Sequence, residues 1–563
     1  MNRVTSIDAR MLERFEQGYA ARPELNVMSN AVSRTALPDA AFVPAAAAKL
    51  RMDFSVLVKT NNITNQKQSG RCWMFSTLNV LRQRVIAKCD LEDFSFSPTY
   101  LAFYDKLEKA NLFLENILHF ADQDLTDRET YTLLGNPLPD GGQWDMAISL
   151  IKKYGVVPSW VMPETVHSTG TAKYLPILNR KLREDALELR AMAKEGKDTA
   201  ARREEMLAEI YNALCILYGQ PPRSFDFEYT DKDEHYHCDR NLTPHTFLEK
   251  YVGNDLDDYV VIISSPIHAL NRTYCQPFMG DVVEENMFWL NLSQEELEDL
   301  TIRQLQAGEG VMFSCDCHPD GDRANGYWDP DCFQYGEVLG GLTFGMTKAE
   351  RLLTRESTMN HCMMFCGVNL DENGKADRWK IENSWGDASG QKGYYIGSEK
   401  WFKANVYQIT VRKSLLSDAQ RALLRKVEPH DLVKFGLIPE LIGRLPVITV
   451  LDDLDEDALV RVLKEPRNSL VKQYKELLGM DNVELTFTDE ALHAIARKTI
   501  ERKTGARGLR SVMESILLPI MYEVPSDATI IRVTVDEDTV EGGEAHLEYG
   551  AVRKRYKNQA ALS

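Results

Sequence analysis

The stretch Asn65-Gln66-Lys67-Gln68-Ser69-Gly70-Arg71-Cys72-Trp73-Met74-Phe75 decides the fold, because it joins a cysteine to the start of an apolar helical pattern. Apolar side chains continue from this stretch at intervals of four, three and four residues, at Met74, Leu78, Leu81 and Val85. This spacing predicts a helix with one apolar face. Cys72 would then lie at the helix N-terminus, where unpaired amides and the positive end of the helix dipole favour a thiolate.

Such surroundings lower a thiol pKa from about 8.5 to roughly 3.5–7.5, so Cys72 is predicted to be a nucleophile at neutral pH. Gly70 permits a tight turn before the helix. The Gln66 side-chain amide and the Cys72 backbone N–H could together stabilise a developing oxyanion. The alternative for a single cysteine is a buried structural thiol.

Two polar residues far downstream favour the nucleophile. His361 and Asn383 both lie on strand-like runs, in the segments Met359-Asn360-His361-Cys362 and Lys380-Ile381-Glu382-Asn383-Ser384-Trp385-Gly386. Cysteine, histidine and asparagine in this order fit the papain arrangement, in which the histidine exchanges a proton with the thiol and the asparagine orients the imidazole. Trp385 would shield the bond between His361 and Asn383 from water.

Three segments together resemble the bleomycin hydrolase and aminopeptidase C branch of the papain-like cysteine peptidases. They are residues 66–73, Asp140-Gly141-Gly142-Gln143-Trp144 and residues 359–361, with residues 152–158 and 265–268 similar as well. The resemblance covers residues 1–426 and implies an α+β fold with a helical lobe, a β lobe and helical insertions. It further implies peptide substrates, a substrate backbone held at Gly141 and Gly142, and a homo-hexamer built partly by the charged helical region 171–218.

Composition limits the remaining classes. A chain of 563 residues exceeds what one hydrophobic core usually supports, so two or more domains are expected. The formal charge of −18 disfavours nucleic acid, and no window is long and apolar enough for a membrane span. The ten cysteines form no regular framework and the N-terminus has no apolar signal core, so a cytoplasmic protein without disulfides is expected.

Two clusters have metal-binding residue types, His235-Tyr236-His237-Cys238 and Cys315-Asp316-Cys317-His318. Neither has the two-by-two spacing of a zinc site, and strand alternation would place Cys315 and Cys317 on one face with only two ligands assured. No metal site is therefore predicted. Residues 311–315 are better interpreted as a buried strand. Further strands are expected at residues 54–58, 363–368, 378–382, 393–396 and 406–411.

The character of the sequence changes near residue 427, where a second domain, residues 427–563, is predicted. Residues 427–446 and 503–511 resemble the C-terminal part of the ClpX AAA+ unfoldase, and the similarity extends over 427–536. It implies a small α/β lid domain, with Arg444 as an arginine finger and Arg507 as a sensor residue for nucleotide. No Gly-x-x-x-x-Gly-Lys-Ser/Thr loop occurs in the chain, so no nucleotide or other cofactor is predicted, and the alternative for both arginines is a solvated surface position.

Three functional hypotheses follow. The first is a thiol peptidase that uses Cys72, His361, Asn383 and Gln66. The second is an interaction module in which the tail docks on an AAA+ partner. The third is an accidental fusion with a non-functional tail. In the resembling peptidases the chain ends in an arm that fills the cleft and restricts cutting to N-terminal residues, whereas this chain continues into the AAA+-like segment.

Overall fold

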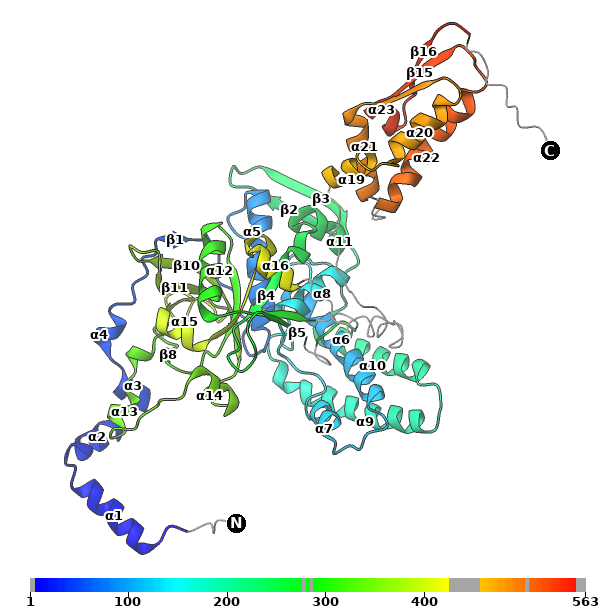
Figure 1. The fold of residues 1–563 in the computed structure, drawn as a ribbon. Helices are drawn as coiled ribbons and strands as arrows, with labels where there is room; N and C mark the ends of the chain where they lie inside the picture. Colours follow the sequence, from blue (N-terminus) through cyan, green and yellow to red (C-terminus); the bar gives the residue numbers. More distant parts are fainter. Residues whose placement is uncertain (1–5, 276–279, 284–286, 425–455, 502–505, 553–563) are drawn as a thin grey trace. The chain divides into compact units, whose positions relative to one another are not determined.

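The computed structural model describes residues 6–275, 280–283, 287–424, 456–501 and 506–552. The chain divides into two compact units, Met1–Arg425 and Lys426–Ser563. The first is a mixed helical and sheet structure with two large hydrophobic cores and a third, smaller one, and the second is a smaller α/β unit with a core of its own. Figure 1 labels their elements.

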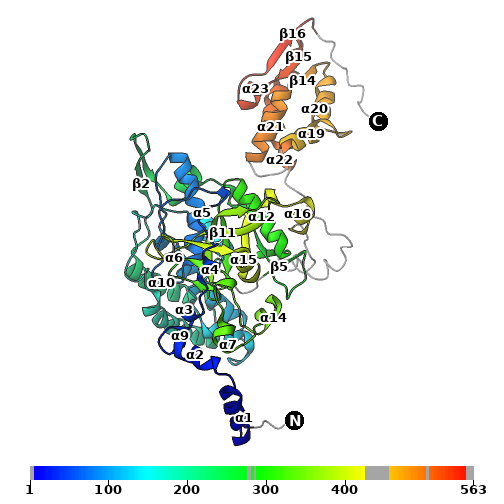
Figure 2. The ribbon, with the colours of Figure 1, turned by 90° about the vertical axis from the view of Figure 1, so that its left-hand side faces the viewer.

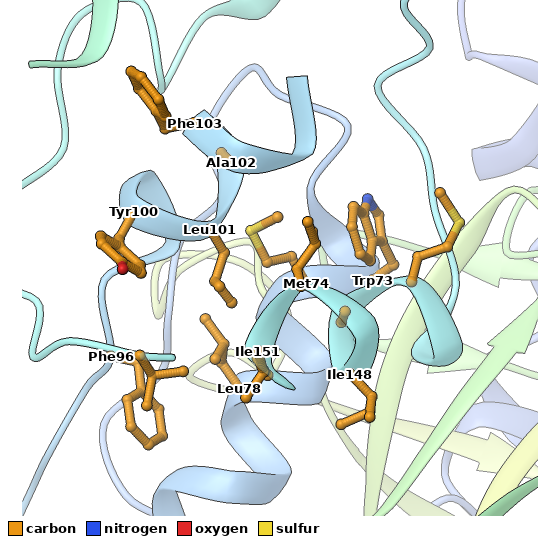
Figure 3. Packing of buried hydrophobic residues seen from close by; sticks show 14 of the residues in the cluster. Trp73, Met74, Leu78, Phe96, Tyr100, Leu101, Ala102, Phe103, Ile148 and Ile151 are labelled. Atoms are coloured by element: carbon orange, nitrogen blue, oxygen red, sulfur yellow. The ribbon is translucent and has the colours of Figure 1, made fainter. Parts of the chain in front are cut away.

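Three helices form the centre of the first core. They are α5 (Cys72–Cys89), α6 (Pro98–His119) and α8 (Trp144–Tyr154). Figure 3 shows Trp73, Met74 and Leu78 of α5 packed against Leu101 of α6 and against Ile148 and Ile151 of α8. The residues whose spacing predicted this helix, Met74, Leu78, Leu81 and Val85, are all buried. The prediction of a single apolar face was wrong, because every residue from Cys72 to Arg82 is buried. This core fixes the helix whose first residue is Cys72.

The charged region predicted as helical contains α9 (Leu175–Lys194) and α10 (Ala200–Tyr218). Both pack on α6, and Figures 1 and 2 show α6 and α10 side by side. The apolar residues of α10 that face the core recur every four residues, at Met206, Ile210, Leu214 and Tyr218. Its remaining surface is largely charged or exposed, as expected for a helix that covers a core on one side only.

A long mixed sheet packs beside helix α5 in the first unit, which is called the peptidase unit below. Its strands follow the order β5-β6-β4-β13-β7-β10-β11-β12-β9-β8, and β1 pairs with β10. The bounds are β1 (Val56–Leu57), β4 (Tyr259–Ile263), β5 (Arg272–Cys275), β6 (Phe288–Asn291), β7 (Val311–Cys315), β8 (Gly321–Asp322), β9 (Tyr327–Trp328), β10 (His361–Leu370), β11 (Ala376–Glu382), β12 (Tyr394–Ser398) and β13 (Val406–Arg412). The strands expected from the sequence in this region lie within one or two residues of β7, β10, β11, β12 and β13.

Strand β10 separates the two cores, because successive side chains of a strand point to opposite faces. Cys362, Met364 and Cys366 belong to the helical core that contains Cys72. Met363 and Phe365 belong to the core on the other face, which is covered by α12 (Gln294–Gln306) and α15 (Glu399–Asn405). The first residue of β10 is His361, so the strand carries this histidine to the boundary between helices and sheet.

The N-terminal arm differs in part from its expectation. The predicted helix at residues 9–19 is α1 (Ala9–Ala20), but the arm at residues 26–51 contains three further helices. They are α2 (Glu24–Val32), α3 (Leu37–Ala41) and α4 (Pro44–Ala47). Helices α3 and α4 are too short to show a repeating apolar pattern in the sequence. Each also has a proline in its first turn, where proline is compatible with a helix, but from the sequence alone these prolines indicate irregular chain.

The second unit packs helices against a small sheet. The order of the sheet is β14-β15-β16, and β14 runs parallel to β15. Its core includes Leu463, Leu492, Met513 and Val533. The elements are α19 (Glu456–Lys464), α20 (Leu470–Gly479), β14 (Glu484–Phe487), α21 (Asp489–Glu501), α22 (Ala506–Glu523), β15 (Ile530–Val535), α23 (Glu537–Glu541) and β16 (His546–Tyr549). This is the small α/β fold expected for the tail.

Candidate active site

Helix α5 and strands β10 and β11 bring three predicted residues together. The Nε2 atom of His361 lies 2.9 Å from Oδ1 of Asn383, and the Ser384 backbone N–H donates to the same oxygen at 2.7 Å. The side-chain oxygen of asparagine has no hydrogen and can only accept a hydrogen bond. The imidazole must therefore donate to it, so Nε2 of His361 carries a proton. The other ring nitrogen, Nδ1, is then the one available to the hydrogen bond between His361 and the Cys72 thiol.

The environment of Cys72 favours the thiolate. A hydrogen bond from the Cys362 thiol holds the Cys72 pKa well below its usual range, against the effect of burial, and His361 lowers the pKa further through its charge and a hydrogen bond. The Cys362 pKa is raised well above its ordinary value by the same hydrogen bond and by burial, so this second thiol stays protonated. Of the two thiols, Cys72 is thus the one whose thiolate form is favoured, and Cys362 is the one that stays protonated.

An aromatic ring covers the histidine. Trp385 stacks on His361 with ring centroids 4.7 Å apart and an interplanar angle of 25°. The Arg323 guanidinium lies 3.8 Å from the centroid of the Trp385 ring. The indole therefore shields the imidazole from water, as expected from its place two residues after Asn383, whereas nothing in the sequence pointed to Arg323.

Gln66 lies in the same cavity as Cys72 and is held rigidly. Its Nε2 donates to the Ser69 carbonyl at 2.6 Å, and its Oε1 accepts from the Ser384 hydroxyl at 2.6 Å. Since a side-chain amide carries two hydrogens, one remains for another acceptor. Backbone N–H groups of the first helical turn are also free of intrahelical partners, and that of Cys72 is among them.

The segment Asp140–Trp144, called the glycine turn below, contributes Gly141 and Gly142 to the lining of this cavity. A Cβ atom at Gly142 would lie 2.5 Å from Cε2 of the buried Trp73 ring, so only glycine fits there. A Cβ at Gly141 would meet nothing within 4 Å, which leaves that position open toward the cavity. Of the two predicted substrate-binding glycines, Gly142 is therefore required by packing against Trp73, whereas Gly141 leaves open space beside the main chain.

A buried charge network supports the glycine turn, and sequence reasoning missed it. Lys109 Nζ donates to the Gly141 carbonyl at 2.7 Å and pairs with Asp105 at 2.7 Å. Lys106 pairs with Asp140 at 2.9 Å, and Asp140 accepts from the Gly70 backbone N–H at 2.5 Å. Burial raises the Asp140 pKa, but the Lys106 charge and the hydrogen bonds outweigh burial and lower it overall. One carboxylate thus ties the turn before Cys72 to the glycine turn.

These residues enclose a cavity of about 690 Å³. Its lining combines the polar groups of Gln66, Cys72 and His361 with apolar side chains of α6 and α8, such as Phe113 and Met146. A pocket with a few convergent polar groups on an otherwise apolar wall is typical of an enzyme active site.

The structure describes the remaining predicted positions only in part. Arg444 lies outside the described residues, and Arg507 belongs to α22 with a side chain that is not described. His237 pairs with Asp231 at 2.7 Å at the end of the hairpin formed by β2 (Phe225–Thr230) and β3 (Tyr236–Leu242). Cys315 lies in the sheet core. Within the described ranges no three His, Cys, Asp or Glu residues are grouped as metal ligands, and no helix is sufficiently long and apolar to cross a membrane.

Comparison with known families gives two matches. The model of the Peptidase C1-like family matches residues 6–436, and that of the C-terminal, D2-small domain of ClpB protein matches residues 454–536. The second match confirms an AAA+ lid domain. Its model describes ClpB, whereas the sequence suggested ClpX, and residues 427–446 of that resemblance lie outside both this match and the described residues.

Individual relatives agree with the first match. Aminopeptidase G of Lactobacillus delbrueckii subsp. lactis is 43% identical over 419 residues, which is 73% of this chain and 95% of the relative. Aminopeptidase E of Lactobacillus helveticus is 41% identical and covers 73% of this chain and 94% of its own length. A crystal structure of PepW from Lactobacillus rhamnosis has a TM-score of 0.73 at 41% identity, covering 75% of this chain and 95% of that one.

Proposed function

The chain belongs to the Peptidase C1-like family, and we propose that it is a cysteine aminopeptidase with Cys72 as nucleophile and His361 and Asn383 as its partners. The observation that carries this proposal is the 2.9 Å bond from His361 Nε2 to Asn383 Oδ1 beside a thiol with a lowered pKa. Relatives named aminopeptidases G, E and C support the same activity.

In the acylation step the Cys72 thiolate attacks the substrate carbonyl carbon. The oxygen of that carbonyl takes up negative charge, and the Cys72 N–H and the free Nε2 hydrogen of Gln66 stabilise it. Protonated His361 then donates its Nδ1 proton to the leaving amine, so the peptide bond breaks and a thioester forms on Cys72.

In the deacylation step neutral His361 removes a proton from water, and the resulting hydroxide attacks the thioester. Asn383 keeps the Nε2 hydrogen bonded throughout, so that Nδ1 remains directed at the reacting atoms. The Cys72 thiolate leaves and the site returns to its starting state. Trp385 keeps water away from the bond between His361 and Asn383.

The substrate backbone lies along Gly141 in this proposal. Gly141 has no neighbour within 4 Å of its Cβ direction, so an extended peptide can approach the main chain closely. Its carbonyl is held by Lys109 and its neighbour Gly142 by Trp73, which makes the edge rigid. Gly142 contributes through the shape of the turn.

The proposal extends to assembly, location and the tail. The helical insertion with α9 and α10 supports a homo-oligomer of the hexameric kind expected from the sequence resemblance, working in the cytoplasm. The separate core of the second unit supports a tail that folds by itself and docks on an AAA+ partner. Capture of such a partner by residues 427–563 alone, without the peptidase unit, would test the docking.

The activity test measures hydrolysis of a fluorogenic aminoacyl substrate by the full chain and by Cys72→Ala. Loss of all thiol-dependent turnover in a folded Cys72→Ala protein is expected. Asn383→Ala should lower kcat on the order of ten- to a hundredfold, less than the roughly 10²–10⁴ that a positioned acid–base group contributes. An active Cys72→Ala protein would overturn the proposal.

A further inference from the structure

A second thiol lies against the proposed nucleophile. Cys362 follows His361 on β10 and faces the helical core that contains Cys72. Both cysteines line the cavity of about 690 Å³ and belong to the same hydrophobic core, where α5 packs against β10. The Cys362 thiol is also close enough to lower the Cys72 pKa. Because a disulfide needs Cα atoms within about 7 Å of one another, two thiols that share one cavity and one core are the pair to consider.

The position of Cys362 is fixed by the sheet. Cys362 pairs with Ser314 across β7 and β10, and the Ser314 hydroxyl lies 3.2 Å from the Cys362 sulfur. The exposed fractions of Cys72 and Cys362 are 8% and 6%, so both sulfurs are reached mainly through the cavity. A small oxidant that enters the cavity would meet the Cys72 thiolate first, because Cys362 remains a thiol.

We propose that Cys72 is reversibly oxidised by hydroperoxides and that Cys362 is the resolving cysteine, which closes a Cys72–Cys362 disulfide. This inference rests on the proposed function only in taking Cys72 as the reactive thiolate. It assigns to Cys362 a role that the peptide-hydrolysis chemistry does not require.

The chemistry balances in two steps. The Cys72 thiolate attacks the hydroxyl oxygen of the hydroperoxide and the O–O bond breaks, which leaves a sulfenic acid on Cys72. The departing alkoxide or hydroxide takes a proton from the His361 imidazolium and leaves as an alcohol or water. The Cys362 sulfur then attacks the Cys72 sulfur, the S–OH bond breaks, and the Cys362 proton leaves with the hydroxide as water. His361, which precedes Cys362 in the chain and hydrogen-bonds the Cys72 thiol, can carry that proton.

Loss of the negative charge of Cys72 on oxidation makes Cys362 more reactive in the second step. The negative charge of Cys72 and the hydrogen bond to it are among the causes that keep Cys362 protonated. A sulfenic acid carries no such charge, so Cys362 becomes easier to deprotonate once Cys72 is oxidised. The nucleophile thus controls when its partner reacts.

Other cysteines near the site are less well placed. Cys315 lies in the sheet core on the opposite face of β7 from Ser314, the cross-strand partner of Cys362. Cys366 lies on the same face of β10 as Cys362, but its thiol is directed to the Lys380 carbonyl at 3.7 Å. Cys366→Ala therefore provides a matched control, since it removes a buried thiol from the same strand and the same core.

The consequence is protection of the enzyme. A disulfide removes the nucleophile and occupies the cavity next to His361, so peptidase activity stops. A thiol reductant restores it, whereas a sulfinic or sulfonic acid on Cys72 would be permanent.

The experiment exposes the full chain to hydrogen peroxide and follows intact mass, disulfide peptide mapping and activity before and after dithiothreitol. The wild type and Cys366→Ala should lose two hydrogen atoms in mass, show a Cys72–Cys362 linked peptide, and regain most of their starting activity. Cys362→Ala should instead gain two or three oxygen atoms on Cys72 and regain little of its own starting activity.

A linked peptide that joins Cys72 to Cys315 or Cys317, or wild-type Cys72 found only with added oxygens, would overturn the proposal. Cys362→Ser repeats the test with a polar side chain of similar size if Cys362→Ala folds poorly. Mass and mapping do not depend on activity, so failure of the disulfide is distinguishable from failure of the peptidase assignment, which the hydrolysis assay of Cys72→Ala decides.

Discussion

At the scale of single residues, the reactivity of Cys72 depends on its neighbours. The hydrogen bond from Cys362 is the largest cause of its lowered pKa, ahead of the contributions of His361. A lower pKa keeps the thiolate present at lower pH, so it places the acid limb of the rate profile well below the ordinary thiol range. Removing the donor raises the Cys72 pKa and moves this limb toward alkaline pH.

We therefore expect Cys362→Ala to shift the acid limb of kcat/KM upward in pH relative to the wild type. The same shift should occur in the pH dependence of iodoacetamide alkylation at Cys72, which reports the thiolate directly. Cys366→Ala is the control, because its thiol bonds the Lys380 carbonyl and should leave the limb in place. An unmoved limb in Cys362→Ala would show that His361 alone sets the pKa.

At the scale of elements, the glycine turn before α8 is held by the first turn of α5. The Trp73 ring is fully buried, lies over Gly142 and donates from Nε1 to the Asp140 carbonyl at 3.2 Å. Because this ring cannot move aside, Gly142→Ala should lower the free energy of unfolding of the peptidase unit by about 1–3 kcal/mol, as overpacking of a core does.

Urea unfolding followed by tryptophan fluorescence would measure this loss. Gly141→Ala supplies the matched control on the adjacent residue, since its Cβ meets nothing within 4 Å. Gly141→Ala should leave stability within about 0.5 kcal/mol of the wild type. Equal stability of the two variants would contradict the packing described for Trp73.

Helices and strands with long apolar stretches could be predicted from the sequence. Helix α5 and the strands β7, β10 and β11 were predictable because their apolar residues continue over a long stretch, although α5 is buried on all sides of its first turns and not on one face. Cys72, His361 and Asn383 were predictable because their residue types and order suit one chemistry. Helices α3 and α4 of the N-terminal arm had too few residues for a repeating apolar pattern to emerge.

The electrostatic support of the site was not predictable. Lys106 and Lys109 lie on a helix whose charged residues would ordinarily face water, yet both are buried and paired with carboxylates from α6 and from the turn at Asp140. The contact between Cys362 and Cys72 likewise depends on where β10 meets α5. Such pairings arise only when segments far apart in sequence are folded together.

At the scale of the whole molecule, the second unit is an AAA+ lid without a phosphate-binding loop anywhere in the 563 residues. A lid arginine contributes to nucleotide binding only when a loop cradles the phosphates. The purified chain should therefore show no saturable heat on titration with magnesium-ATP. Tight stoichiometric binding would mean that the tail forms a nucleotide site by itself.

We also propose that the continuation of the chain past α16 (Asp418–Leu424) affects specificity. An exopeptidase needs a group that closes the cleft and a negative charge that meets the substrate ammonium. The sequence resemblance implies that a terminal carboxylate serves both needs in the resembling peptidases, and we propose that the position corresponding to it in this chain is an uncharged peptide bond. Glu428 or Asp431 could replace that charge through a charge-assisted hydrogen bond.

We expect the full chain to cleave N-blocked or internal peptide bonds more readily than those peptidases do. Matched free-amine and N-acetylated fluorogenic peptides, given to the full chain and to a version ending at Lys426, would measure the preference. Strict turnover of free-amine substrates by the full chain would contradict the expectation and direct attention to Glu428 and Asp431.

The central claim is that Cys72 carries the acyl intermediate. It is tested most directly by titrating the full chain with a peptidyl chloromethyl ketone while residual activity and modified cysteines are measured together by peptide mapping. The account predicts one adduct per chain, on Cys72, with activity falling in proportion to its occupancy. Activity that survives complete modification of Cys72, or that disappears while Cys72 is unmodified, would contradict it.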